Sequence, residues 1–147
     1  MKSQNTFADM QNTEYPAKVI IAWGEAIKGN KAIREWLMEN GYPELGIFVH
    51  ALHNQDEARN WLLTNGFPHL MALINGAEGN PNAILWLRKH GYTILEKMAQ
   101  AGDNREESYL WLLNHGHQDF AMVANRIRQV KNEIDENNND MHRMSGV

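Results

Sequence analysis

The stretch that decides the fold is residues 58–68, which read ARNWLLTNGFP. Ala58, Trp61 and Leu62 follow the i, i+3, i+4 spacing of one helical face. Gly66 then ends the helix, because glycine adopts the left-handed backbone of a helix C-terminus without steric cost. Pro68 suits the first position of a second helix. The stretch therefore predicts two short helices joined by a tight turn.

The same pattern recurs along the chain at a constant spacing. A tryptophan is followed at once by a leucine, and five positions later by a glycine. The tryptophans are Trp36, Trp61, Trp86 and Trp111, and the glycines are Gly41, Gly66, Gly91 and Gly116. A fixed period of this kind is typical of helical-repeat proteins, in which each unit buries its apolar face against its neighbours. These eight residues are predicted to be structural.

Repetition of the unit places the helices along the chain. We expect a leading helix over 16–28 and then helix pairs over 30–40 with 43–53, 55–65 with 68–77, 81–90 with 93–101, and 105–115 with 118–136. The second helices end at Gly29-Asn30, Gly79-Asn80 and Gly102-Asp103. The predicted fold is an all-α solenoid of about four 25-residue repeats with a long C-terminal capping helix. Residues 16–136 form the repeat domain, between flexible segments at 1–15 and 137–147.

Composition excludes several classes of protein. The chain has 147 residues, the size of one domain, and 14 basic against 18 acidic residues, which argues against a general binder of phosphate backbones. The absence of cysteine excludes disulfides and thiolate chemistry. The longest apolar runs, such as residues 19–23, have five residues, far short of the roughly 20 residues of a spanning helix. The first sixteen residues carry no secretory pattern, so we expect a cytoplasmic protein.

Histidine is the one candidate for metal binding. His50 and His53 lie i, i+3 on a predicted helix, but zinc needs three or four ligands and no cysteine can complete the set. His90 and His115 stand where Asn40 and Asn65 stand in the earlier repeats, so a polar cap at a helix C-terminus explains them. No phosphate-binding loop and no GxSxG motif occurs. We predict no catalytic residue, no metal and no cofactor, and therefore a protein that is not an enzyme.

Some helical repeats read one nucleic-acid base per unit, and that function would need a column of repeated polar or basic side chains. The matching positions are Arg34, Arg59, Ile84 and Tyr109, which lose their charge halfway along the array. Nucleic-acid binding therefore stands as the alternative to protein binding, and a metal-dependent enzyme using His50 and His53 is a distant third.

Recognition residues of a repeat protein are expected where the repeats differ. The two residues before each tryptophan are polar in the first two units but are Ile84 and Leu85, and Tyr109 and Leu110, in the last two. Either the long last helix covers these four side chains, or a partner protein does. We take them as the candidate partner-binding residues.

The last helix carries an apolar stripe longer than one repeat needs. The stripe consists of Phe120, Val123, Ile127, Val130 and Ile134, in steps of three and four residues. It can cap the array of its own chain, or it can pair with a second copy as a short coiled coil. A homodimer through this helix is therefore one possible assembly.

The WLxxNG[YF] unit resembles the helical-repeat solenoids as a class, such as ankyrin, tetratricopeptide and HEAT repeats. The resemblance covers residues 16–136, although the unit is shorter than that of ankyrin and the Thr-Pro-Leu-His signature of ankyrin is missing. It implies a binding scaffold that acts without catalysis, and it transfers no site residues.

Overall fold

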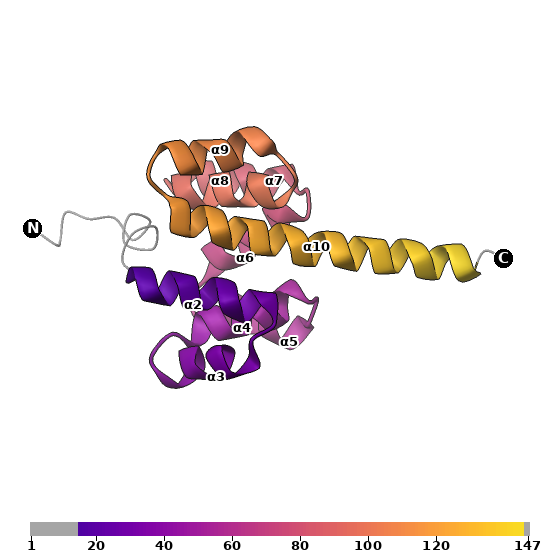
Figure 1. Cartoon of the computed structure of the whole chain (residues 1–147), viewed down its shortest axis with the longest axis horizontal. Helices are drawn as coiled ribbons and strands as arrows, with labels where there is room; N and C mark the ends of the chain where they lie inside the picture. The colour runs from indigo at the N-terminus through magenta and orange to yellow at the C-terminus, as the bar shows by residue number, and fades with distance from the viewer. Residues whose placement is uncertain (1–14, 146–147) are drawn as a thin grey trace, which may run out of the picture.

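The computed structural model describes residues 15–145, with their side chains up to residue 139. Over this range the chain is all-helical (Figure 1), which confirms the predicted fold class. The helices are α2 Ala17–Lys28, α3 Lys31–Glu39, α4 Pro43–Leu52, α5 Asp56–Thr64, α6 Pro68–Ala77, α7 Pro81–Lys89, α8 Thr93–Gly102, α9 Glu106–Asn114 and α10 Gln118–Ser145. The N-terminal segment expected to be flexible lies, apart from Tyr15, outside the described residues.

Two kinds of turn alternate along the array. The first kind follows α3, α5, α7 and α9, and uses the predicted glycine column, with a φ of +90° at Gly66. The second kind has its left-handed residue at Gly29, Asn54, Gly79 and Asn104, again one repeat length apart. The helix end expected at Gly102-Asp103 is confirmed, since Gly102 is the last residue of α8 and Asp103 is its C-cap. The left-handed residue of this turn follows at Asn104. Asparagine tolerates the left-handed region better than other residues with a side chain, which is why Asn104 can take this place.

The helices form an inner and an outer set. The inner helices α2, α4, α6, α8 and α10 carry a column of fully packed side chains, namely Trp23, Phe48, Leu73, Met98 and Val123. The rings of Trp23 and Phe48 meet edge to face at 5.0 Å. The outer helices α3, α5, α7 and α9 each insert one leucine beneath the tryptophan column, and all four leucines are 0% exposed. The leucine after each tryptophan is therefore the main contribution of the outer helix to the core.

The long helix α10 closes the array. It packs against α8 and α9 of the last repeat, and equally against α2 at the other end of the array (Figure 1). Because α2 contacts α4, α4 contacts α6 and α6 contacts α8, the five inner helices form a closed circle of contacts. The capping of its own array, expected from the apolar stripe with the helix laid along the last unit, is confirmed by the contacts with α8 and α9. The contact with α2 was not expected from the sequence, and there Met122 and Val123 of α10 lie against Gly24.

Small residues explain the tight contacts within this circle. A Cβ atom added at Gly76 would lie 2.8 Å from the Cβ of Ala99, and one added at Gly102 would lie 3.0 Å from the Cβ of Ala77. The distance between packed helices depends on the side chains at the contact. The helix pairs α6–α8 and α8–α10 are therefore in extensive contact, whereas α4 touches α6 only lightly.

The helix α10 ends at Ser145, well beyond the predicted end at residue 136. The run Asn137 to Asp140 was expected to stop it, but residues 137–145 include neither glycine nor proline. Asparagine and aspartate cost less than about 0.7 kcal/mol each in a helix, which is too little to force a break. The C-terminal part of α10 consequently projects beyond the rest of the described structure (Figure 1).

Candidate functional site

The tryptophan column lies at the edge of the core and not within it. Trp36 is 40% exposed, and the other three are half-buried. The residue four positions after each tryptophan binds its carbonyl oxygen. Asn40 Nδ2 and Asn65 Nδ2 donate to it over 2.8 and 2.9 Å, and the Nδ1 atoms of His90 and His115 lie 2.9 and 2.8 Å from it. The predicted role of the asparagine and histidine side chains in this column as helix C-terminal caps is thereby confirmed.

A row of ring contacts, stacked except for the tilted pair Phe67–His69, connects the second and third tryptophans. It runs through Trp61, Phe67, His69, Tyr92, Trp86 and His90, with neighbouring centroids 4.1 to 5.9 Å apart. His69 is buried in this row, and burial lowers the pKa of its imidazole from 6.5 to about 4. The ring is therefore neutral at pH 7 and belongs to the packing.

Two surface hollows repeat in register with the sequence. The α4/α5 hollow has a volume of about 230 Å³ and is lined by Ile47, His50, Gln55, Glu57, Ala58 and Trp61. The α6/α7 hollow has a volume of about 300 Å³, and its lining includes the positions one repeat later, namely Ala72, Asn75, Asn80, Asn82, Ala83 and Trp86. Each hollow lies between an inner helix and the tryptophan of the outer helix that follows. Neither hollow was predicted from the sequence, although the repeat columns contain the residues that line them.

The place between α8 and α9 that corresponds to the α6/α7 hollow is filled by side chains of that repeat. The Lys97 ammonium lies 5.5 Å from the centroid of the Trp111 ring. The Ser108 hydroxyl donates to Gln100 Oε1 over 2.7 Å. The amide that is equivalent to Asn75 is thus satisfied within this repeat, and Trp111 is covered.

A further hollow on α5 joins the two repeated ones. It has a volume of about 440 Å³ and is lined by Asp56, Glu57, Arg59, Asn60 and Leu63. Glu57 also lines the α4/α5 hollow, and Leu63 also lines the α6/α7 hollow. We call these three joined hollows the α5 surface. Leu63, which lines two of the three hollows, is 54% exposed.

Charge on the α5 surface is acidic. The guanidinium of Arg59 is engaged, since its Nη2 lies 2.9 Å from Glu78 Oε2 and its Nε donates to the Ala51 carbonyl over 2.9 Å. Asp56 and Glu57 form no ion pair with another described residue. Both lie in the first turn of α5, where the helix dipole favours negative charge.

The four predicted partner-binding residues fall into two pairs, one half-buried and one exposed. Ile84 is half-buried against Gly76, and Tyr109 is half-buried with the guanidinium of Arg128 5.9 Å from its ring centroid. Leu85 and Leu110 are exposed by 55% and 47%. Of the two alternatives, cover by α10 is therefore wrong for this pair. Among the four, the packing explains Ile84 and Tyr109 and leaves Leu85 and Leu110 open.

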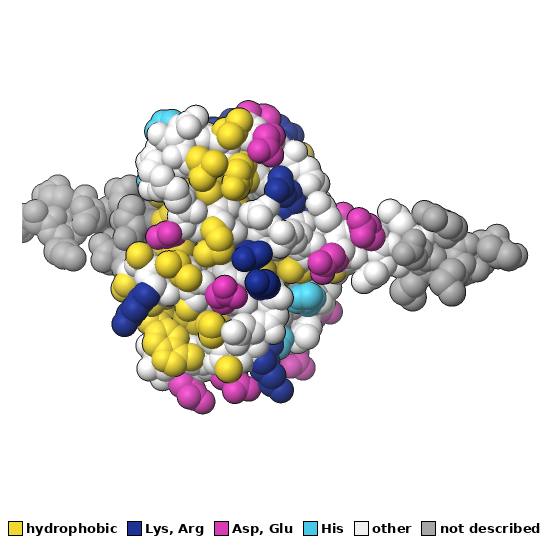
Figure 2. All heavy atoms as spheres, viewed as in Figure 1, with side chains coloured by type: hydrophobic (Ala, Val, Ile, Leu, Met, Phe, Trp, Pro, Cys, Tyr) yellow, Lys and Arg dark blue, Asp and Glu magenta, His cyan; other side chains and the backbone are white. Residues whose placement is uncertain are grey.

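Other exposed apolar residues lie at the start of the array. Figure 2 shows apolar side chains at the surface over α2 and α3, where Ile21, Trp36 and Met38 are exposed. Ile21 stands one repeat length before Gly46, which is covered by Met38 of the outer helix α3. Among the described residues no outer helix precedes α2 as α3 precedes α4, so no side chain equivalent to Met38 lies over Ile21.

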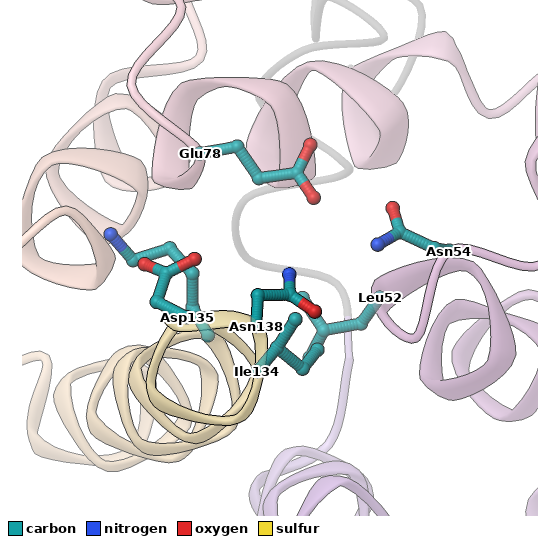
Figure 3. Close-up of a pocket in the computed structure, with 7 residues that line it drawn as sticks. Leu52, Asn54, Glu78, Ile134, Asp135 and Asn138 are labelled. Carbon is teal, nitrogen blue, oxygen red and sulfur yellow. The ribbon is translucent and has the colours of Figure 1, made fainter. Parts of the chain in front are cut away.

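A polar cavity lies between the C-terminal ends of α4 and α6 and the middle of α10 (Figure 3). It has a volume of about 300 Å³ and is lined by Leu52, Asn54, Glu78, Lys131, Ile134, Asp135 and Asn138. Its ionic groups are largely engaged, because Glu78 pairs with Arg59 and the Lys131 ammonium lies 3.3 Å from Asp103 Oδ1. The contact between Lys131 and Asp103 ties α10 to the end of α8, and neither contact assigns a ligand to the cavity.

Neither a metal-binding cluster nor a membrane-spanning helix occurs among the described residues. They include no group of three histidine, aspartate or glutamate side chains that could hold a metal ion. Burial and the guanidinium of Arg34 lower the pKa of His50, the ligand first considered for zinc. None of the helices in the described range has the length and apolar character to cross a bilayer.

Comparison with known proteins gives no relative. No protein-family model, no curated protein and no solved structure matches the chain. Fold alone does not determine function, so the residues of the site have to carry the inference.

Proposed function

We propose that the protein is a non-catalytic helical-repeat scaffold that binds another protein through the α5 surface. The observation that carries this proposal is the recurrence of an open hollow beside Trp61 and again beside Trp86. A third hollow on α5 connects them, since it shares Glu57 with the first and the exposed Leu63 with the second. Apolar hollows bordered by a few polar groups are typical binding sites, and exposed apolar side chains grouped together mark interaction surfaces. A cytoplasmic location is part of the proposal, because the chain contains no cysteine.

Charge favours a protein partner over nucleic acid. Among the described residues that line the α5 surface, Arg59 is the one lysine or arginine, and it is paired with Glu78. The unpaired groups are the carboxylates of Asp56 and Glu57, which repel phosphate. Fluorescence anisotropy with labelled single- and double-stranded oligonucleotides at low salt is expected to show no binding. Tight, salt-dependent binding would favour the nucleic-acid alternative instead.

The proposal is tested by chemical cross-linking in native cell extract, followed by mass spectrometry of the cross-linked peptides. The whole protein carrying Leu63→Lys is compared with wild type and with Leu85→Lys as a matched control. Both leucines are exposed on outer helices, so both variants should fold. We expect a defined partner whose cross-links fall on α5 and are lost with Leu63→Lys only.

Other outcomes have definite meanings. Loss of the partner with Leu85→Lys or Leu110→Lys, and not with Leu63→Lys, would move the binding site to the leucine pair predicted from the sequence. Wild-type protein that forms no specific cross-link in the native extract would contradict the proposed function.

A further inference from the structure

The partner chemistry of the α5 surface can be specified further, on the basis of the proposed function. We propose that this surface binds an extended peptide segment of the partner. One apolar side chain of that segment lies in the α6/α7 hollow, and a lysine or arginine of the same segment lies beside Asp56 and Glu57.

The α6/α7 hollow offers an apolar floor with amides at its edge. Leu63, Met71, Ala72 and Trp86 supply the apolar part, and no charged side chain lines the hollow. The side-chain amides of Asn75 and Asn82 line it as well. Neither amide forms a hydrogen bond with another described residue. An amide group both donates and accepts, which matches the C=O and N–H groups of a peptide backbone.

The shape of the surface favours an extended chain over a helix. A volume of about 300 Å³ is at the small end of ligand sites, suited to one or two side chains. The neighbouring hollow is reached across α5 through the single residue Leu63. An extended chain advances about 3.3 Å per residue and keeps its backbone N–H and C=O groups available. A helix satisfies those groups internally and would leave Asn75 and Asn82 without partners.

Charge determines what flanks the apolar side chain. Asp56 and Glu57 lie at the hollow that adjoins Leu63, and Arg59 is neutralised there by Glu78. A basic side chain next to the apolar one complements these two carboxylates. A second copy of this protein fits poorly, because symmetric pairing would bring together two copies of the same acidic surface.

The test uses the whole protein and a phage-displayed library of random twelve-residue peptides as the probe. Wild type is expected to enrich peptides with an apolar residue and a lysine or arginine within a few positions of it. The variant Asn82→Trp fills the hollow from an exposed position on α7. The control Lys89→Trp adds the same side chain to the same helix outside the hollow.

Affinities are then measured by fluorescence anisotropy with one enriched peptide in synthetic form. We expect Asn82→Trp to weaken binding by at least about tenfold, Asn75→Ala to weaken it by a smaller factor, and Lys89→Trp to bind as wild type does. Asp56→Lys combined with Glu57→Lys should keep the apolar preference and lose the preference for basic residues. Thermal melts of every variant verify that the fold is intact.

Two results would overturn the inference, and they differ from failure of the proposed function. Enriched peptides that bind Asn82→Trp as tightly as wild type would place the peptide elsewhere. A partner found by cross-linking on α5 through a folded domain, with no peptide enriched, would retain protein binding and reject the extended segment. If no peptide is enriched and no partner is cross-linked, both the extended segment and the proposed function are rejected.

Discussion

At the scale of single residues, the leucine after each tryptophan matters more to the core than the tryptophan itself. Leu62 is 0% exposed, whereas Trp36 is 40% exposed. Tryptophan has the larger surface, but here the ring lies over a helix end, and in the last two repeats a histidine stacks on it 4.1 and 4.0 Å away. The recurrence of a large residue in the sequence therefore did not indicate complete burial.

This difference predicts the order of two mutational effects. Leu62→Ala removes packed atoms and leaves a cavity, and should lower the free energy of unfolding by about 2–5 kcal/mol. Trp36→Ala should cost less, because much of the ring already faces water. Urea denaturation of both variants measures the difference. A larger loss for Trp36→Ala would show that the tryptophan column carries the core.

The buried His69 predicts a pH dependence. Its pKa is about 4 in the folded protein and 6.5 when exposed, so the unfolded chain binds the proton more readily. The stabilisation is complete above pH 6.5 and is lost as the pH falls from 6.5 to about 4, by up to about 3 kcal/mol. The repeat supplies the control His69→Ile, since isoleucine occupies the matching position 94. Urea denaturation at pH 7.5 and pH 4.5 should show a smaller pH effect in that variant, and equal effects would contradict the assignment.

At the scale of helices, the distance between neighbouring inner helices depends on which repeats have glycine or alanine at the contacts. Gly102 lies between Ala77 of α6 and Ile127 of α10, with 3.0 and 3.2 Å from its added Cβ to the nearest atoms of these residues. Leu52 occupies the same column in α4, where the contact with α6 is slight. The inner helices therefore approach each other unevenly, although the repeats have one length.

Gly102→Leu should separate α8 from both neighbours. We expect a loss of about 1–3 kcal/mol, typical of an overpacked core, or more because two helix contacts are involved. Denaturation of the variant and hydrogen exchange of α8 and α10 would measure the effect. Unchanged stability and exchange would mean that α6, α8 and α10 do not pack as closely as described.

At the scale of the whole molecule, α10 joins the two ends of the array. Removal of residues 126–147 deletes the buried Ile127 and Val130, worth about 3–6 kcal/mol together. Much of a typical domain stability would be lost, and α2 would lose cover at the same time. Removal of residues 140–147 alone should leave the melting temperature nearly unchanged. Equal melting temperatures for both truncations would contradict closure by α10.

A homodimer through the C-terminal helix is still a prediction, and the structure limits which residues of α10 a second copy can contact. Ile127 is buried within its own chain and is unavailable to a second copy, whereas Ile134 is only partly buried. Ile127→Asp should lower stability in any assembly. If two copies pair through α10 at the partly buried Ile134, Ile134→Asp should convert a dimer into a folded monomer by light scattering. Wild type that is already monomeric would reject the dimer.

The sequence by itself determined the helices, their turns and their order. Helix ends depend on local chemistry, such as Gly66 in a left-handed turn and Pro68 at a helix start, so the repeat columns placed them closely. The one large error was the end of α10, where asparagines without glycine or proline could not stop a helix.

Tertiary structure alone decided the closure of the array and the place of the candidate site. Contact between α10 and α2 joins residues about 100 positions apart, and a periodic pattern carries no information on which distant faces meet. The α5 surface arises in the same way, since its hollows form between consecutive helices and are open or filled according to single side chains such as Asn75 or Lys97. Leu85 and Leu110 could be recognised as variable positions in the sequence, but their exposure depends on helices that pack elsewhere.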